Sequence, residues 1–240
     1  MQPSPNVTDA EPPLPDHRRI LCFGDSNTWG FNPNGSGRIA DGLRWPQQLA
    51  ENLHERRPAM QWHVIEEGLN SRTWLLDDPI GAARYGADYS CSGRSTLMTS
   101  LHSHKPLDTV VLALGCNDCK AYLNLAAEQI TTGAQILIHD IRRAHDCGPR
   151  AMPKQSPAII LMTPPAIQIT PQSLAWGFEG ADEKSIALAE LYRQLAAEMG
   201  VIYFNVQTVA SPSQLDGVHF DCSNQALIAD ALAELIAAKA

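Results

Sequence analysis

The stretch "RILCFGDSNTWG", residues 19–30, guides the interpretation of the whole chain. Its first five residues form a short apolar run of the kind that is buried on both faces of a parallel β-sheet. Gly24, Asp25 and Ser26 follow directly, where the chain has to turn out of the sheet toward a helix. Backbone N–H groups are unpaired at such a turn and favour an oxyanion. The stretch therefore predicts a buried strand that ends at a site for polar chemistry.

Short apolar runs recur along the chain, and amphipathic stretches separate them. The further runs are "WHVIEEG" (62–68), "TVVLALG" (109–115), "AIILMT" (158–163) and "VIYFNV" (201–206). The stretches between them predict helices at about 46–56, 92–103, 125–145, 181–199 and 223–238. Alternating strands and helices are typical of a doubly wound parallel sheet. The sequence thus predicts an α/β fold, a three-layer αβα sandwich with a five-stranded parallel sheet.

The composition excludes several classes of partner. The 240 residues include 18 basic and 26 acidic side chains, for a net charge of −8. A nucleic-acid partner is therefore not expected, because binding to phosphates requires a basic surface. No apolar run approaches the roughly 18 residues that a membrane-spanning helix needs, so no membrane partner is expected either.

The N-terminal 17 residues contain five prolines and no apolar core of a secretion signal. We interpret residues 1–17 as a flexible arm and residues 18–240 as one domain, since no repeat or linker interrupts the pattern. Six cysteines are scattered without a compact disulfide framework. Without a secretion signal, this distribution favours reduced thiols in a cytoplasmic protein.

Four polar segments follow predicted strands, and they supply the candidate site. They are "GDSNTWG" (24–30), "GLNSRT" (68–73), "GCND" (115–118) and "DGVHF" (216–220). In an open parallel sheet, ligands bind beyond the carboxyl ends of the strands. The four segments are therefore expected to converge at one edge of the sheet.

The residue types in these segments match the requirements of nucleophilic catalysis. A serine hydroxyl is a weak nucleophile until a base takes its proton, and His219 is the candidate base for Ser26. Asp216 lies three residues before His219, close enough to hold the imidazole. For the developing oxyanion, the Asn117 side chain, the Ser26 N–H and an N–H of the 69–72 turn are candidate donors.

The C-x-x-C pair formed by Cys116 and Cys119 offers a different interpretation, as a redox dithiol or half of a zinc site. Zinc needs about two further ligands, and no second C-x-x-C or H-x₃₋₅-H is present. A thioredoxin-like pair is expected to open a helix after the first strand of its unit. The pattern favours a function for the residues between the cysteines, and no metal site is expected.

Taken together and in order, these segments resemble the GDSL/SGNH hydrolases, and most closely the GDSL arylesterase/acyltransferase branch. The resemblance implies a flavodoxin-like SGNH fold without a cofactor. It also implies Ser26 as nucleophile, His219 as general base, Asp216 as its orienting carboxylate, and an oxyanion hole formed by Ser26, Ser71 and Asn117. The position of Ser71 is usually Gly or Ala in this family, so the hydroxyl is a departure.

The resemblance further implies short acyl esters, acetyl esters especially, as substrates and alcohols as acceptors for acyl transfer in water. Four aromatic residues are candidates to wall an apolar substrate pocket, namely Trp29, Phe31, Trp176 and Phe178. For Trp176 and Phe178, core packing or a subunit contact is an equal alternative. Deacetylation of sugars or natural products is an alternative, in which Asn27, Ser71 and Arg72 would contact hydroxyl groups. A non-catalytic binding module on the same scaffold is a further alternative. The family resemblance and the long loops at 31–44, 74–91, 147–157 and 164–180 favour a homo-oligomer.

Overall fold

The computed structural model describes residues 17–86, 89–150 and 154–239. The predicted N-terminal arm lies outside the described residues except for His17, which is the first residue of strand β1 (His17–Gly24). Within the described part of the chain, none of the helices has the length and apolar character needed to cross a membrane.

A five-stranded parallel sheet forms the centre of the molecule, in the order β2-β1-β3-β4-β5. The other strands are β2 (Gln61–Gly68), β3 (Thr109–Ala113), β4 (Ala158–Met162) and β5 (Ile202–Phe204). The chain leaves β1 on one side to form β2 and returns to the other side with β3. The carboxyl ends of β1 and β3 therefore flank the topological switch point, where ligands bind in open α/β sheets.

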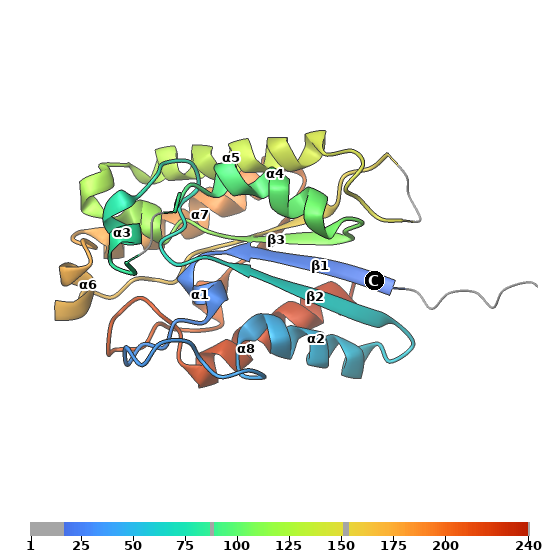
Figure 1. The fold of residues 1–240 in the computed structure, drawn as a ribbon, viewed down its shortest axis with the longest axis horizontal. Coiled ribbons are helices and arrows are strands. Elements are labelled where there is room, and N and C mark those ends of the chain that lie inside the picture. Colours follow the sequence, from blue (N-terminus) through green and yellow to red (C-terminus); the bar gives the residue numbers. More distant parts are fainter. Residues whose placement is uncertain (1–16, 87–88, 151–153, 240) are drawn as a thin grey trace, which may run out of the picture.

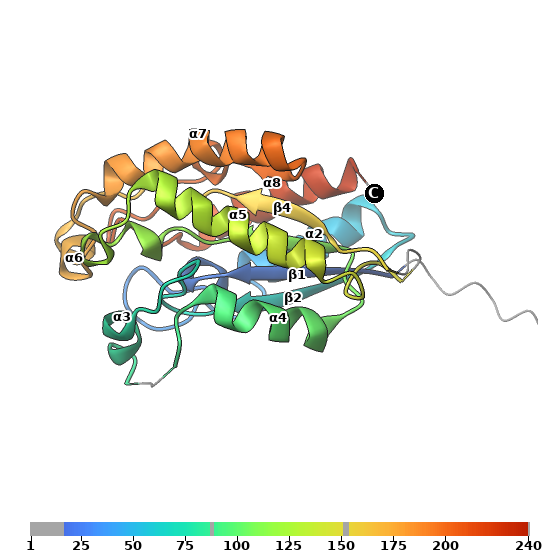
Figure 2. The ribbon, with the colours of Figure 1, turned by 90° about the horizontal axis from the view of Figure 1, so that it is seen from above.

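Helices cover both faces of this sheet, which confirms the predicted αβα sandwich (Figures 1 and 2). One face packs against α2 (Trp45–Arg56) and α8 (Cys222–Ala237), and the other against α4 (Gly93–His104), α5 (Ala127–Arg143) and α7 (Ala181–Met199). Side chains of β1 alternate between the two cores, as the two-residue period of a strand requires. Ile20 and Cys22 enter the α2/α8 core, whereas Leu21 and Phe23 enter the other.

Each of the long helices begins and ends within about two residues of its prediction, but the short elements were not predicted. Helices α1 (Ser26–Trp29), α3 (Pro79–Ala83) and α6 (Pro171–Ala175) lie at the carboxyl edge of the sheet, at the left of Figure 1. The 3₁₀ turns are η1 (Asn117–Cys119), η2 (Ala121–Leu123) and η3 (Val206–Thr208). The three short helices depend on side-chain caps, since they are too short for a hydrophobic period. The capping side chains are those of Asp25, Asp78 and Thr170.

Gly115 connects β3 to the η1 turn in a conformation that favours glycine. Its φ is +111°, and a Cβ at this position would lie 2.4 Å from the Tyr192 hydroxyl. That hydroxyl is buried, accepts a hydrogen bond from Trp74 Nε1 at 2.7 Å and lies 3.3 Å from the Leu114 carbonyl oxygen, to which it donates. Gly115 therefore lets the chain turn closely past Tyr192 and carry Asn117 to the sheet edge.

Candidate active site

Ser26 lies where the first strand ends and the short helix α1 begins. The carboxylate of Asp25 caps this helix by accepting the Asn27 N–H at 2.9 Å. The Ser26 carbonyl accepts hydrogen bonds from the N–H groups of Gly30 and Phe31, each at 2.9 Å. These bonds define a tight turn that presents the serine hydroxyl at the carboxyl edge of the sheet.

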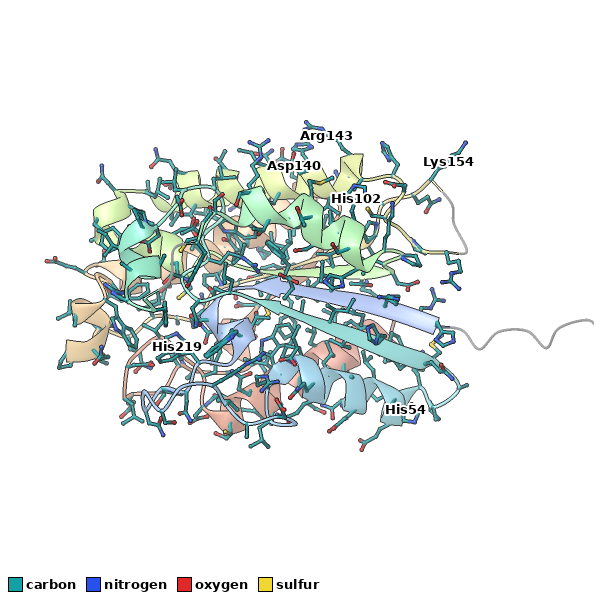
Figure 3. The ribbon with its side chains drawn as sticks, viewed as in Figure 1. His54, His102, Asp140, Arg143, Lys154 and His219 are labelled. Carbon is teal, nitrogen blue, oxygen red and sulfur yellow. The ribbon has the colours of Figure 1, made fainter. Side chains whose placement is uncertain are left out.

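The structure brings Ser26, His219 and Asp216 together in one hydrogen-bonded row. His219 Nε2 lies 2.8 Å from Ser26 Oγ, and Nδ1 lies 2.8 Å from Asp216 Oδ2. The other oxygen of Asp216 accepts the N–H groups of Val218 and His219, at 2.8 and 2.9 Å. The carboxylate thus orients the imidazole with one oxygen and shapes the loop with the other. Figure 3 shows His219 beside α1, and all three side chains are buried.

Asn27 joins the serine turn to the histidine loop. Its Nδ2 donates to the Val218 carbonyl at 3.3 Å, and its Oδ1 accepts the Phe220 N–H at 3.2 Å. The Asn27 carbonyl in turn accepts a hydrogen bond from Gln225 on α8. Asn27 does not line the cavity described below, so the prediction that it contacts substrate is not supported. Its carboxamide holds the Ser26 and His219 segments together.

Three potential donors belong to residues that line the cavity at Ser26, and two of them are backbone groups. Among the described residues, neither the Ser26 N–H nor the Ser71 N–H donates a hydrogen bond to another protein group. Asn117 donates one amide hydrogen to the Arg72 carbonyl at 3.1 Å, and its second hydrogen remains for a ligand. Ser26, Ser71 and Asn117 line the same cavity. The arrangement fits an oxyanion hole.

Ser71 adopts a left-handed backbone conformation, with a φ of +64°. A side chain costs roughly 1–2 kcal/mol in this region, which glycine occupies freely. This conformation gives a physical reason why glycine suits the position. The hydroxyl of Ser71 also lies where a Cβ on Gly81 would collide with it, at 2.6 Å. The turn at Ser71 and helix α3 therefore pack in close contact.

Arg72 and Trp29 do not line the cavity, contrary to prediction. The buried Arg72 guanidinium donates to the Gly24 carbonyl at 2.9 Å and to the Glu67 carbonyl, and lies over the Phe23 ring at 4.1 Å. It holds the Ser71 turn against β1. The Trp29 ring is covered by the Arg38 guanidinium at 5.2 Å.

The cavity at the triad is narrow, with a volume of about 20 Å³. That is little more than the space one water molecule requires. Phe178 lines it, and the rings of Phe31 and Trp176 pack against His219 at 4.5 and 5.5 Å and contact each other edge to face at 5.9 Å. Arg84, Tyr85, Lys120 and Val218 complete its wall. A larger cavity of about 510 Å³ lies at the amino end of the sheet, away from the triad.

Lys120 is a wall residue for which the sequence analysis assigned no role. Its ammonium group is buried and pairs with Asp78 at 2.6 Å. The Tyr122 hydroxyl donates to the same carboxylate, whose Oδ1 also accepts the Gly81 N–H at 2.8 Å. Burial would raise the pKa of Asp78, but the hydrogen bond and charge of Lys120 outweigh it and lower this pKa. The pair fixes the α3 loop against η1. The position of Lys120 directly after Asn117-Asp118-Cys119 was a sequence signal that could have placed it at the site. The sequence offered no such signal for Arg84 or Tyr85.

The cysteines around Asn117 are both buried and free. Burial raises the pKa of each thiol well above its usual value, which disfavours the reactive thiolate. Within the described ranges, one cluster has metal-ligand spacing, and it consists of His102, Asp146 and Cys147. The Lys105 ammonium already occupies that cluster, since it lies 2.7 Å from Asp146 and 3.4 Å from His102.

Replacing Ser71 tests whether its N–H or its hydroxyl serves the oxyanion. We expect Ser71→Gly to retain activity within about threefold, because the N–H remains. We also expect the free energy of unfolding to rise by up to about 1 kcal/mol as the left-handed strain is relieved. By contrast, Asn117→Ala is expected to lower kcat about a hundredfold to a thousandfold. Ester hydrolysis and urea unfolding measure these effects. A Ser71→Gly variant as inactive as Asn117→Ala would contradict the backbone assignment.

The pH dependence of stability tests the buried carboxyl of Asp118, which accepts the Trp74 N–H at 3.0 Å. Burial raises its pKa to about 7, and the charge of Asp25 adds to the effect. Between about pH 4 and pH 7, the folded chain therefore keeps a proton that the unfolded chain has lost. The stability that this group contributes is greatest below pH 4 and is lost as pH rises through 7.

We expect the Asp118→Asn variant to lack this loss, because a carboxamide does not titrate. The free energy of unfolding of the wild type should therefore fall relative to the variant between pH 4 and pH 7. Urea unfolding at a series of pH values measures this difference. Two parallel stability curves would show that Asp118 is not the group responsible.

The sequence matches the GDSL-like Lipase/Acylhydrolase family over residues 22–223. Among solved structures, an aryl esterase of M. smegmatis is similar with 34% identity and a TM-score of 0.81, covering 92% of this chain and 99% of its own. A carbohydrate acetylesterase family member from Sinorhizobium meliloti has 37% identity and a TM-score of 0.80, covering 91% and 97%. A second carbohydrate acetylesterase from that organism has 33% identity and a TM-score of 0.81, covering 93% and 100%.

No curated protein matches the sequence significantly. The family match nevertheless spans most of the chain, and the structural relatives exceed 30% identity over nine-tenths of it. On these grounds the chain belongs to the GDSL-like lipase/acylhydrolase family and is a carboxylic ester hydrolase.

Proposed function

We propose that the protein is a serine esterase that cleaves short-chain acyl esters, acetyl esters especially, through an acyl-enzyme. The observation that carries this proposal is the row of two 2.8 Å contacts from Ser26 through His219 to Asp216, facing a cavity of about 20 Å³. A cavity of this size favours the smallest acyl groups. The same row argues against a non-catalytic binding module, which has no need of an aligned base.

In the first half of the reaction, Ser26 Oγ attacks the ester carbonyl carbon while His219 Nε2 takes the hydroxyl proton. The carbonyl oxygen becomes an oxyanion, which the N–H groups of Ser26 and Ser71 and the Asn117 amide stabilise. Asp216 stabilises the imidazolium and keeps its tautomer. Collapse of the intermediate breaks the bond to the alcohol oxygen, which leaves with the proton from His219.

In the second half, an acceptor hydroxyl attacks the acyl carbon while His219 takes its proton. Collapse of this second intermediate breaks the bond to Ser26 Oγ, which receives that proton from His219. Water as acceptor gives the free acid, and an alcohol gives a new ester. The rings of Phe31 and Trp176 form one aromatic cluster with His219, and Phe178 lines the same cavity as His219. Apolar surroundings favour an organic alcohol over water, and this supports acyl transfer as a second activity. None of the steps requires a metal or a cofactor.

Two further proposals concern the context in which the enzyme works. Self-association is supported by exposed apolar side chains around the active-site edge, at Leu76, Ile80, Tyr85, Leu174 and Leu215. Burying such side chains between subunits would remove them from water. A cytoplasmic location is supported by the six free cysteines, five of them buried. In an oxidising compartment, cysteines tend to form disulfides, whereas thiols stay reduced in a cytoplasm.

Labelling with a small fluorophosphonate tests the activated serine. We expect one adduct in the intact mass of the wild type and none in Ser26→Ala. A Ser36→Ala variant, altered in an exposed loop, is the matched control and should be labelled like the wild type. Equal labelling of wild type and Ser26→Ala, or no adduct on folded wild type, would overturn the proposed nucleophile.

Acyl transfer is tested by supplying phenyl acetate and benzyl alcohol together in water. We expect benzyl acetate to form alongside acetic acid, because the acyl-enzyme is shared by both acceptors. Gas chromatography of both products measures the partition. Hydrolysis without any benzyl acetate would leave the esterase assignment intact and reject the transferase activity.

A further inference from the structure

The cavity at the triad has a positively charged wall. Its described lining residues include Arg84 and Lys120 but neither an aspartate nor a glutamate. The Lys120 ammonium is already neutralised, because it pairs with Asp78. The Arg84 guanidinium has no such partner, since it forms no hydrogen bond or ion pair in the part of the chain that the structure describes. One positive charge therefore remains uncompensated at the catalytic cavity.

This local charge contrasts with that of the protein as a whole. The chain carries a net charge of −8, which repels anionic molecules overall. Arginines on the outer surface are neutralised by this excess of acid. Arg94 and Arg143, for example, share the Asp140 carboxylate. An unpaired arginine at the active site is therefore an exception that calls for a ligand.

Buried contacts hold the segment that carries Arg84. This residue directly follows helix α3, whose N-terminal cap is Asp78. The Asp78 carboxylate accepts the Gly81 N–H at 2.8 Å and a hydrogen bond from the Lys120 ammonium at 2.6 Å. Gly81 in turn packs against Ser71, one of the oxyanion donors. The backbone of α3 is thus fixed beside the oxyanion hole, whereas Arg84 itself is exposed to solvent.

The next residue provides a second available donor on the same wall. Tyr85 lines the cavity and is 41% exposed, and its hydroxyl forms no hydrogen bond with another described residue. A guanidinium offers parallel N–H groups that match the two oxygens of a carboxylate, and a nearby phenol can donate a further hydrogen bond. Because one positive charge is uncompensated, the ligand that balances it is a monoanion. These two side chains therefore match a carboxylate.

The size of the cavity indicates which part of the ester carries this carboxylate. The space of about 20 Å³ beside Ser26 accommodates only a short acyl group. Arg84 both lines the cavity and is exposed, so it stands at the mouth. The alcohol part of a bound ester extends from the ester oxygen through this mouth toward solvent. A carboxylate on the alcohol part is therefore the one that reaches Arg84.

We propose that Arg84 selects esters whose alcohol part carries a carboxylate, by pairing its guanidinium with that group at the mouth of the cavity. No internal contact of the protein has to break for this pair to form, because the guanidinium has none among the described residues. The carboxylate takes no part in the covalent steps. This assignment rests on the proposed esterase function and adds the charge of the preferred alcohol to it.

The test compares three aryl acetates of similar size, namely the anionic 4-acetoxybenzoate, the neutral 4-acetoxybenzamide and the cationic 4-(trimethylammonio)phenyl acetate. For each protein, kcat/KM of each charged ester is divided by that of the neutral one. Comparing these ratios between a variant and the wild type cancels the intrinsic reactivity of the esters. The informative variants are Arg84→Gln and Arg84→Glu. Arg143→Glu is the matched control, because it changes the net charge equally on α5, away from His219 (Figure 3).

We expect Arg84→Gln to lower the ratio for 4-acetoxybenzoate about threefold, which is the scale of an exposed ion pair. Arg84→Glu should lower the same ratio about tenfold, because repulsion adds to the lost attraction. It should also raise the ratio for the cationic ester about threefold, a gain that a folding defect does not produce. Arg143→Glu should change neither ratio.

Unchanged ratios in both Arg84 variants, or equal changes in Arg143→Glu, would overturn the role of Arg84. A second pair of esters, monoethyl succinate and neutral ethyl succinamate, carries the charge difference on the acyl part. An effect of Arg84→Gln that is confined to this second pair would overturn the assignment to the alcohol part. A wild type that hydrolyses none of these esters, nor phenyl acetate, would instead count against the esterase function itself.

Discussion

The Asn27 carboxamide is the contact on which the arrangement of the site depends. It donates to the Val218 carbonyl and accepts from the Phe220 N–H, and so joins segments separated by about 190 residues. Ser26 and His219 belong to these two segments, and a proton can move between them only if their separation stays near 2.8 Å. Because the amide is buried, any movement of one segment would leave polar groups unpaired, at a cost of about 1–3 kcal/mol each. The contact therefore keeps His219 Nε2 within hydrogen-bonding distance of Ser26 Oγ.

The other parts of the site are held by the same kind of constraint, a buried polar side chain paired with the backbone of a neighbouring strand end. Arg72 bonds the carbonyl of Gly24 and positions the Ser71 turn. Asp118 accepts the Trp74 N–H and links η1 to the segment after that turn. Polar groups of this kind are costly to bury unless they are paired, so they specify one arrangement of the loops. The strands bring the site segments to one edge of the sheet, and these buried polar pairs fix the distances between the segments.

The sequence predicted the fold, and it singled out the Ser26, Asp216 and His219 side chains that the structure brings into one hydrogen-bonded row, because the patterns concerned are local. Apolar runs of strand length predicted the sheet, and the polar segments after these runs predicted Ser26, Asn117 and His219 as site residues. It assigned Asn27, Trp29 and Arg72 to substrate, since polar or aromatic side chains near a nucleophile suggest contact with a ligand. Their actual partners lie on other strands and loops, and such pairings have no signal in the spacing of residues. Helices α3 and α6 are likewise too short for a hydrophobic period.

The position of Trp176 between the two cavities has a consequence for how this enzyme can diversify. Trp176 lines the narrow cavity beside Ser26 and also a cavity of about 440 Å³ that lies between the loop at residues 33–35 and helix α6. A substitution at Trp176 therefore alters both cavities in a single step, so their shapes are inherited as a linked trait. Independent tuning requires residues that belong to one space alone, such as Phe178 on one side and Leu215 on the other. Lineages that change only these outer positions alter one cavity and leave the other as it is.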